Sequence, residues 1–220
     1  MINLRLLQLV SPSLPVGAYS YSQGLESAVE AGIVHDAPSA QAWIAGVFAL
    51  SVATMEAPIL ARLIAAWGAR DRAAVRRWNA ELLASRETAE LRAETVQMGY
   101  SLRLLLRDLG LEDVDSLDAL GEVAFATPFA FAVDRWAIEP HEALAAYLFG
   151  WIENQALAAV RCVPLGQTDG QRIVYALAEG IPEAVNRAAA LPDDALANFA
   201  PGLALVSARH ETQYTRIFRS

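Results

Sequence analysis

The residues near the start of the chain that could do chemistry are the serines of "SPSLPVGAYSYSQGLE", residues 11–26. A nucleophilic serine needs a sharp turn, typically G-x-S-x-G between a strand and a helix, with a histidine brought close by the fold. The spacing from Gly17 to Ser20 and Ser22 does not fit that turn. The chain also contains no lysine for a Walker-A phosphate contact. These residues therefore predict neither a serine hydrolase nor a nucleotide loop.

Potential metal ligands are few and lie far apart in the sequence. His35, His141 and His210 are the only histidines, and Cys162 is the only cysteine. Spacing does not exclude a site that combines all four, but isolated residues of these types more often cap helices or lie at the surface. No disulfide, zinc finger or thiol pair can form within one chain. We predict no metal site and no cofactor.

Two pairs of glutamates lie four residues apart, Glu26 with Glu30 and Glu90 with Glu94. Such pairs on helices could suggest acid-base or di-metal chemistry, but a di-iron bundle also needs Glu-x-x-His on two helices, and that motif is missing. We interpret the pairs as solvated helix faces or contributions to helix dipoles. With no catalytic constellation, the chain is predicted not to be an enzyme.

The opening stretch is better explained by its shape. Its prolines restrict the backbone, and Ser20 or Ser22 can cap a helix that begins near Gln23. Tyr19 and Tyr21 add rigid amphipathic surface of the kind enriched at interfaces. Two interpretations remain open from the residues alone: a loop packed on its own core, or a surface shaped for another protein.

The elements that position these residues are predicted to be helices. Apolar residues recur three and four apart, and nothing between residues 39 and 161 is typical of strands. The predicted fold is an all-α, single-domain bundle of roughly eight to ten helices. The segments expected to be helical include residues 39–53, 56–68, 71–84, 86–109 and 140–161, with further helices before and after Pro182.

The helix predicted at residues 86–109 shows the clearest pattern. Ser85 is a plausible N-cap, Glu87 suits the positive end of the helix dipole, and Gly110 ends the helix. We interpret Gly99 within it as a site of tight helix packing. Its apolar stripe consists of Leu91, Thr95, Met98, Leu102, Leu105 and Leu109.

Composition and charge restrict the class of protein. A length of 220 residues fits one domain, and a net charge of -8 argues against binding a nucleic-acid backbone. The most apolar run, residues 42–55, is shorter than the roughly 20 residues needed to span a bilayer. We expect a cytoplasmic protein that binds no membrane.

The end of the chain, residues 207–220, reads "SARHETQYTRIFRS" and carries three arginines against one glutamate. It therefore opposes the acidic body in charge. Tyr214, Ile217 and Phe218 are its only large apolar side chains, too few to offset an ordering cost of about 1 to 2 kcal/mol per residue. We expect a helical domain over residues 1–206 and a tail over residues 207–220 that is mobile until a partner orders it.

Three segments taken together resemble the UreF family of urease accessory proteins. They are "SPSLPVGAYSYSQGLESAVEAG" at the start, "VPLGQTDGQRIV" in the second half and "SARHETQYTRIFRS" at the end, and "SRETAELRAETVQMGYSLRLL" resembles the central helix of that family. The resemblance covers nearly the whole chain in the same order.

This resemblance implies an all-α protein, usually a homodimer, that is neither an enzyme nor a nickel store. Family members bridge a UreD-type accessory protein, called UreH in some systems, and the GTPase UreG. The assembled complex delivers nickel to apo-urease. Whether the role is to regulate GTP hydrolysis or to gate nickel transfer does not follow from the sequence.

The resemblance also implies which residues meet partners. Gln23 stands where the family often has a histidine or a related polar residue, and we assign it no metal role. Two alternatives remain: an unrelated all-α adaptor, or an enzyme that uses His141 or His210. The residues that the resemblance places in partner-binding regions are Tyr19, Ser20, Gly24, Leu25 and Glu26 in the opening motif, and Arg209, His210, Glu211, Tyr214 and Arg216 in the tail.

Overall fold

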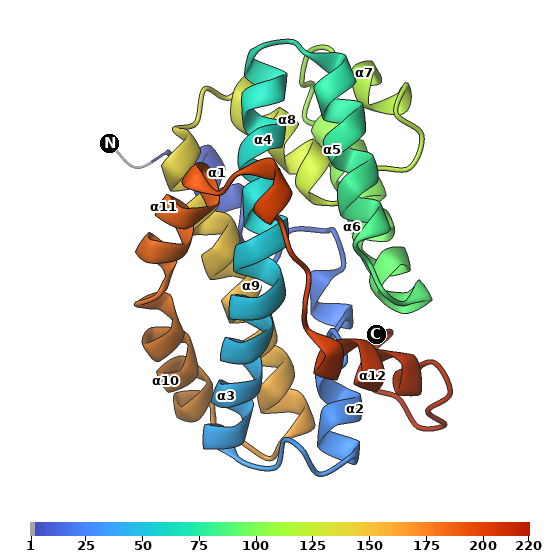
Figure 1. Cartoon of the computed structure of the whole chain (residues 1–220), viewed down its shortest axis with the longest axis vertical. Coiled ribbons are helices and arrows are strands. Elements are labelled where there is room, and N and C mark those ends of the chain that lie inside the picture. Colours follow the sequence, from blue (N-terminus) through green and yellow to red (C-terminus); the bar gives the residue numbers. More distant parts are fainter. Residues whose placement is uncertain (1–2) are drawn as a thin grey trace.

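The computed structural model describes residues 3–220, and within them every regular element is a helix (Figure 1). The predicted all-α class is confirmed. Residues 1 and 2, with which the predicted domain begins, lie outside the described residues. The α-helices are α1 Leu4–Leu9, α2 Leu25–Glu30, α3 Ala37–Val47, α4 Ala57–Gly68, α5 Arg72–Ala84, α6 Ala89–Asp108, α7 Asp115–Asp118, α8 Ala126–Arg135, α9 Pro140–Cys162, α10 Gln167–Ala178, α11 Ile181–Ala190 and α12 Pro201–His210.

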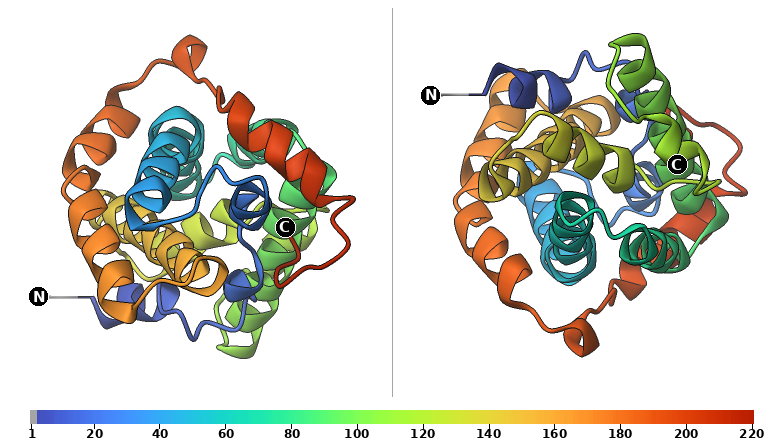
Figure 2. Two further views of the ribbon diagram at one scale, coloured as in Figure 1. Left: turned by 90° about the horizontal axis from the view of Figure 1, so that it is seen from below. Right: turned by 90° about the horizontal axis from the view of Figure 1, so that it is seen from above.

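The middle of the bundle is one long helix that runs through α3, the π-helix η2 (Phe48–Glu56) and α4. End-on views show other helices on most sides of it, with the connector between α11 and α12 crossing the remaining side (Figure 2). α4 packs against α5, α8, α9 and α11, and α3 packs against α9 and α10. Fully buried side chains fill these contacts, among them Leu60, Leu63, Phe129, Phe131 and Leu144.

The prediction of two helices separated before Pro58 was wrong, because the chain stays helical from Ala37 to Gly68. Pro58 has no backbone N–H, so the carbonyl of Thr54, four residues before it, lacks its usual helical donor. The carbonyl of Leu50 accepts a hydrogen bond from the amide of Phe199 at 3.0 Å, and that of Thr54 accepts one from the amide of Ala197 at 3.2 Å. The connector between α11 and α12 is thereby fastened across the central helix.

This continuous helix also corrects the argument about membranes. At 32 residues the helix is long and apolar enough to cross a bilayer, whereas the sequence argument counted only fourteen residues. Its most apolar window is 61% buried inside the protein. That burial is typical of the core helix of a globular bundle, which meets the same length and composition criteria.

α6 begins later than predicted. Thr88 is its N-cap and accepts a hydrogen bond from the amide of Leu91, while Ser85, the predicted N-cap, instead ends α5. The acidic residue of the first turn is Glu90 rather than Glu87. The predicted packing role of Gly99 is confirmed, because a Cβ there would lie 2.2 Å from the carbonyl oxygen of Val123.

The bundle has more helices than the predicted eight to ten, even when the helix from Ala37 to Gly68 is counted once. The one-turn helix α7 lacks the length that makes a periodic pattern visible. α12 was also missed, since the pattern loosens after Pro192. Because α12 runs to His210, the predicted division at residue 206 falls inside a helix.

Candidate partner-binding site

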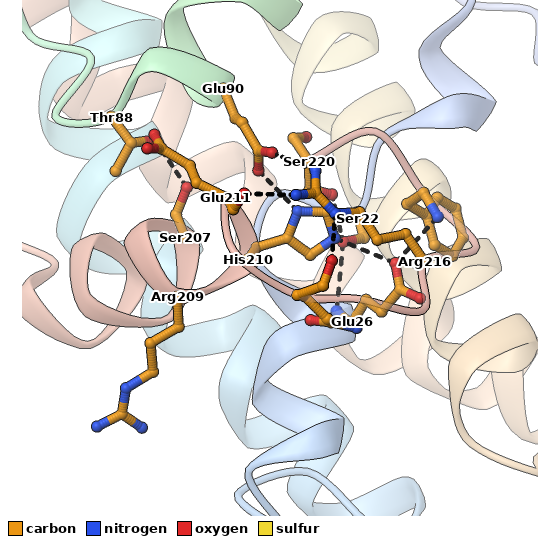
Figure 3. A network of polar contacts seen from close by, with 12 residues as sticks. Ser22, Glu26, Thr88, Glu90, Ser207, Arg209, His210, Glu211, Arg216 and Ser220 are labelled. Carbon is orange, nitrogen blue, oxygen red and sulfur yellow. Dashed lines mark hydrogen bonds and ion pairs between the residues drawn. The ribbon is translucent and has the colours of Figure 1, made fainter.

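Residues 11–26 and the last residues of the chain meet on one side of the bundle, where α2, α6, α9 and α12 converge (Figure 1). We call residues 11–26 the opening segment and residues 211–220 the C-terminal segment. Figure 3 shows the polar contacts that join them. Most of these contacts link residues more than 100 positions apart in the sequence.

Glu26 lies at the centre of this network and is buried. It occupies the first turn of α2, where Ser22 Oγ accepts a hydrogen bond from its backbone amide at 3.2 Å. Its carboxylate accepts from the amide of Ile217 at 2.6 Å and from that of Phe218 at 2.9 Å. A buried carboxylate that receives such donors is stabilised in its place. Glu26 therefore anchors the C-terminal segment.

His210, the last residue of α12, is 0% exposed and lies between two carboxylates. Its Nε2 is 3.2 Å from Glu26, and its Nδ1 is 2.7 Å from Glu90 on α6. The imidazole thus joins α2, α6 and α12 at one point. Glu30, by contrast, is exposed on α2 as the sequence predicted.

Arg216 turns back over this network. Its NH1 donates to Glu90 at 2.7 Å, and its other nitrogens donate to the carbonyls of Glu211 and Gln213. Glu211 in turn accepts a hydrogen bond from the amide of Ala89, in the first turn of α6, at 3.2 Å. A carboxylate at that end of a helix is favoured by the helix dipole.

Backbone pairing extends the contact to residue 220. The amide and the hydroxyl of Ser22 both donate to the carbonyl of Ser220, and the amide of Arg219 donates to the carbonyl of Ser20 at 2.8 Å. Phe218 is buried beside α9, where the guanidinium of Arg161 lies over its ring. This ring is the main apolar anchor of the C-terminal segment.

A second buried carboxylate, Glu94, lies one turn beyond Glu90 on α6 and is 4% exposed. It accepts hydrogen bonds from Gln23 Nε2 at 2.7 Å and from Ser220 Oγ at 2.8 Å, and Gln23 accepts one from Trp151 Nε1. Burial raises the pKa of Glu94 to about 7, although both donors and Arg86 oppose that shift. This site binds a proton near neutral pH.

Beneath Glu94 lies a further buried ionic group. Arg86 pairs with Glu56, which ends η2, and the hydroxyl of Tyr147 donates to the same carboxylate. Burial, followed by the negative charge of Glu56, raises the pKa of Tyr147 well above its ordinary value. These groups border a cavity of about 110 Å³ that also touches Gln23 and Glu94.

No group of three or more histidine, cysteine, aspartate or glutamate side chains is placed to hold a metal ion within residues 3–220. Cys162 lies on α9 near Glu26, and burial, followed by the negative charge of Glu26, raises the pKa of its thiol to about 12. The thiol therefore stays protonated at neutral pH. His35 and His141 are exposed and face only the adjacent Asp36 and Glu139.

The exposed side chains of the two segments and of the adjoining end of α12 are apolar and basic. Tyr214 is fully exposed, Tyr19 is 59% exposed and Ile217 is 63% exposed. Arg209 points away from the polar network into solvent (Figure 3). We call these four residues the terminal face. Aromatic and arginine side chains of this kind are enriched at protein interfaces.

The structure brings the predicted residues into one region, but at different depths. Ser20, Glu26, His210, Glu211 and Arg216 belong to the polar network that joins the ends, and Tyr19, Arg209 and Tyr214 are exposed above it. Two members lie beneath the surface. Leu25 is fully buried, and Gly24, at φ +76°, leaves room for Val206 of α12.

Sequence reasoning missed several members of the network. The four-residue spacing within Glu26–Glu30 and Glu90–Glu94 was the available signal. Glu26 lies in the first turn of α2, as a contribution to the helix dipole requires, but the alternative of solvated faces was wrong for Glu26 and Glu94 because both are buried. Their partners come from distant parts of the chain. The other members that were missed are Gln23, Trp151, Arg161 and Ser220.

The C-terminal segment is docked in the structure; that residues 207–220 are mobile until a partner orders them stays a prediction. The expectation counted Tyr214, Ile217 and Phe218 as anchors, yet only Phe218 is buried. It omitted the polar groups of Glu26, Glu94 and Ser22 that receive the segment. Residues 207–210 are also already ordered within α12.

Comparison with known proteins supports one family. The UreF family model matches residues 34–178. The chain is 54% identical to "Urease accessory protein UreF" of Azoarcus sp. (strain BH72), covering 99% of this chain and 95% of that protein. It is 52% identical to the protein of the same name from Dechloromonas aromatica (strain RCB), covering 98% and 96%. The chain therefore belongs to the UreF family of urease accessory proteins.

Proposed function

We propose that this chain is an adaptor that bridges a UreD/UreH-type accessory protein and the GTPase UreG during insertion of nickel into apo-urease. Membership of the urease accessory family supports this proposal. Nickel is then the cargo of the assembly rather than a resident cofactor of this chain. The proposal includes a cytoplasmic location and a homodimer as the working form.

The terminal face is the observation that carries the proposal. Its exposed Tyr19, Arg209, Tyr214 and Ile217 are presented on a buried framework of hydrogen bonds rather than on a free tail. A framework of this kind lowers the cost of ordering side chains when a partner binds. We therefore assign the contact with the UreD-type partner to this face.

The geometry gives no support to the alternative of a histidine-dependent enzyme. His210 is enclosed by Glu26 and Glu90 and is inaccessible to a substrate. His141 is exposed on the surface beside Glu139. Neither lies next to a nucleophile with the geometry that a catalytic dyad needs.

The test is a reconstitution with the UreD-type protein and UreG, followed by size-exclusion chromatography. Tyr19→Ala and Tyr214→Ala each remove an exposed ring and leave the core intact, so helicity and melting should stay near those of the wild type. Tyr175→Ala is the matched control, because Tyr175 is 76% exposed on α10. We expect the first two variants to weaken the complex at least tenfold and the control to leave it unchanged.

Two results would contradict the proposal. If the wild-type chain joins neither partner, the adaptor role is wrong. If all three tyrosine variants bind like the wild type, the chain contacts its partners elsewhere and the assignment of the terminal face is wrong. A large loss of stability in Tyr19→Ala with binding intact would show that this residue serves packing.

A further inference from the structure

His210 occupies an environment that suits its charged form. Each ring nitrogen lies within hydrogen-bond distance of a carboxylate, Glu26 on one side and Glu90 on the other, and the side chain is 0% exposed. A neutral imidazole carries one N–H donor, whereas an imidazolium carries two, and an ionised carboxylate only accepts. Only the doubly protonated ring can donate to both carboxylates at once.

We propose that His210 is a proton-dependent latch: docking of the C-terminal segment onto α2 and α6 takes up a proton on this ring, so alkaline pH loosens the segment. This inference goes beyond the adaptor function and does not depend on it. It rests on contacts within one chain and can be tested without any partner.

The charges around the ring come from every element packed on it. Glu26 approaches from α2, Glu90 from α6, and Arg216 and Glu211 from the C-terminal segment. On α9, beyond Glu26, lie the guanidinium of Arg161 and the protonated thiol of Cys162.

Loss of the ring proton would weaken docking at a specific place. Arg216 would still neutralise Glu90, and the amides of residues 217–218 would still donate to Glu26. One of the two carboxylates would, however, face an unprotonated ring nitrogen with no donor between them. Two acceptors forced together in a buried site are destabilising, and opening the segment relieves that contact.

The direction of the pH effect follows from proton linkage. A histidine exposed to water loses its proton near pH 6.5, so above that pH the open state holds one proton fewer than a docked state in which the ring donates to both carboxylates. When docking takes up one proton, the opening constant rises by up to tenfold for each pH unit. We therefore expect docking to be firm at pH 6 and weaker at pH 8.

Nuclear magnetic resonance on the full wild-type chain tests this directly. The ¹⁵N shifts of the imidazole rings report whether each histidine carries one proton or two, and the exposed His35 and His141 are internal references. Hydrogen exchange of the amides of residues 217–218, corrected for intrinsic exchange, reports docking. We expect His210 to carry two protons at pH 6 and to lose one only at a higher pH than the exposed His35 and His141, and we expect protection of residues 217–218 to fall at least tenfold by pH 8.

Three variants separate His210 from other titrating groups. His210→Gln should remove the pH dependence of tail protection, whereas Glu94→Gln and the surface control His141→Gln should retain it. A steep dependence that survives in His210→Gln would overturn the proposal. So would protection that is independent of pH in the wild type, or a singly protonated His210 at pH 6. If His210→Gln fails to dock the segment, the wild-type measurements decide alone, and a His210 that loses its proton at the same pH as the exposed His35 and His141 would overturn the proposal.

Discussion

Glu94→Gln is the variant that most directly tests the buried charge in this bundle. Glutamine keeps the shape of the side chain and can still bond Gln23 and Ser220, but it cannot ionise. Glu94 is 4% exposed, and burial raises its pKa from 4.5 to about 7. In the folded wild type, Glu94 is therefore either protonated or a buried negative charge.

The magnitude follows from the shift in pKa. Each pKa unit corresponds to about 1.4 kcal/mol, so the shift of Glu94 amounts to roughly 3 kcal/mol. Below pH 4.5 the residue is protonated in both the folded and unfolded states, and its stabilising contribution is fully present. As the pH rises from 4.5 through 7, the unfolded state ionises first, so this contribution is lost.

Urea denaturation followed by circular dichroism, at several values between pH 4.5 and 8, measures the effect. The free energy of unfolding of Glu94→Gln minus that of the wild type should rise by roughly 3 kcal/mol across this range. The free energy of unfolding of Glu30→Gln, a change on the exposed side of α2, should depend on pH as that of the wild type does. If the free energies of unfolding of Glu94→Gln and the wild type changed with pH in the same way, the conclusion that burial dominates the pKa of Glu94 would be refuted.

Three further predictions concern the anchor, the packing and the cargo. Glu26→Gln removes a charged acceptor, and a hydrogen bond to a charged group is worth about 1.5 to 3 kcal/mol. Hydrogen exchange should therefore show at least a tenfold loss of protection at the amides of residues 217–218. The control Glu30→Gln should show no loss of protection there. Gly99→Ala should destabilise the bundle by about 1 to 3 kcal/mol in urea denaturation, because its Cβ would collide with the carbonyl of Val123. Calorimetry with nickel at neutral pH should give no tight site, and stoichiometric submicromolar binding to the isolated chain would contradict this.

The helical class was predictable because it depends on local periodicity. Helix α9 was expected at residues 140–161 and runs from Pro140 to Cys162, and α5 was expected at 71–84 and runs from Arg72 to Ala84. In both cases the chain carries its own start signal, a proline in the first turn or an aspartate cap. Such signals act over a few residues and need no knowledge of the rest of the fold.

The errors in the helices arise where distant residues decide the outcome. Pro58 is tolerated inside a long helix because the amide of Ala197 supplies the donor that Pro58 cannot give to the carbonyl of Thr54, while the amide of Phe199 bonds the carbonyl of Leu50 one turn earlier. The two donors, the amides of Ala197 and Phe199, lie about 140 residues after Pro58 in the sequence. No local pattern around Pro58 carries that information.

Several residues of the candidate site could be predicted from the sequence, but the contacts among them could not. The resemblance to the UreF family named Glu26, His210 and Arg216, and the structure joins them in one network. That Glu94 and Ser220 also meet there depends on the fold, since 126 positions separate them. A pair of glutamates four residues apart looks the same in sequence whether it faces water or the interior.

The two buried carboxylates differ in how their burial is compensated, and this difference shapes how a partner could act. Glu26 receives two backbone amides and an imidazole at the first turn of a helix, whereas Glu94 receives one amide group and one hydroxyl. If a partner lifted the C-terminal segment, Glu26 would lose the donors from residues 217–218 and Glu94 would lose Ser220. Such a partner would have to replace charge-assisted hydrogen bonds. A partner that binds the terminal face while the segment stays docked meets no such cost, because Tyr19 and Tyr214 are already exposed. The contacts therefore favour recognition of the docked segment over its removal.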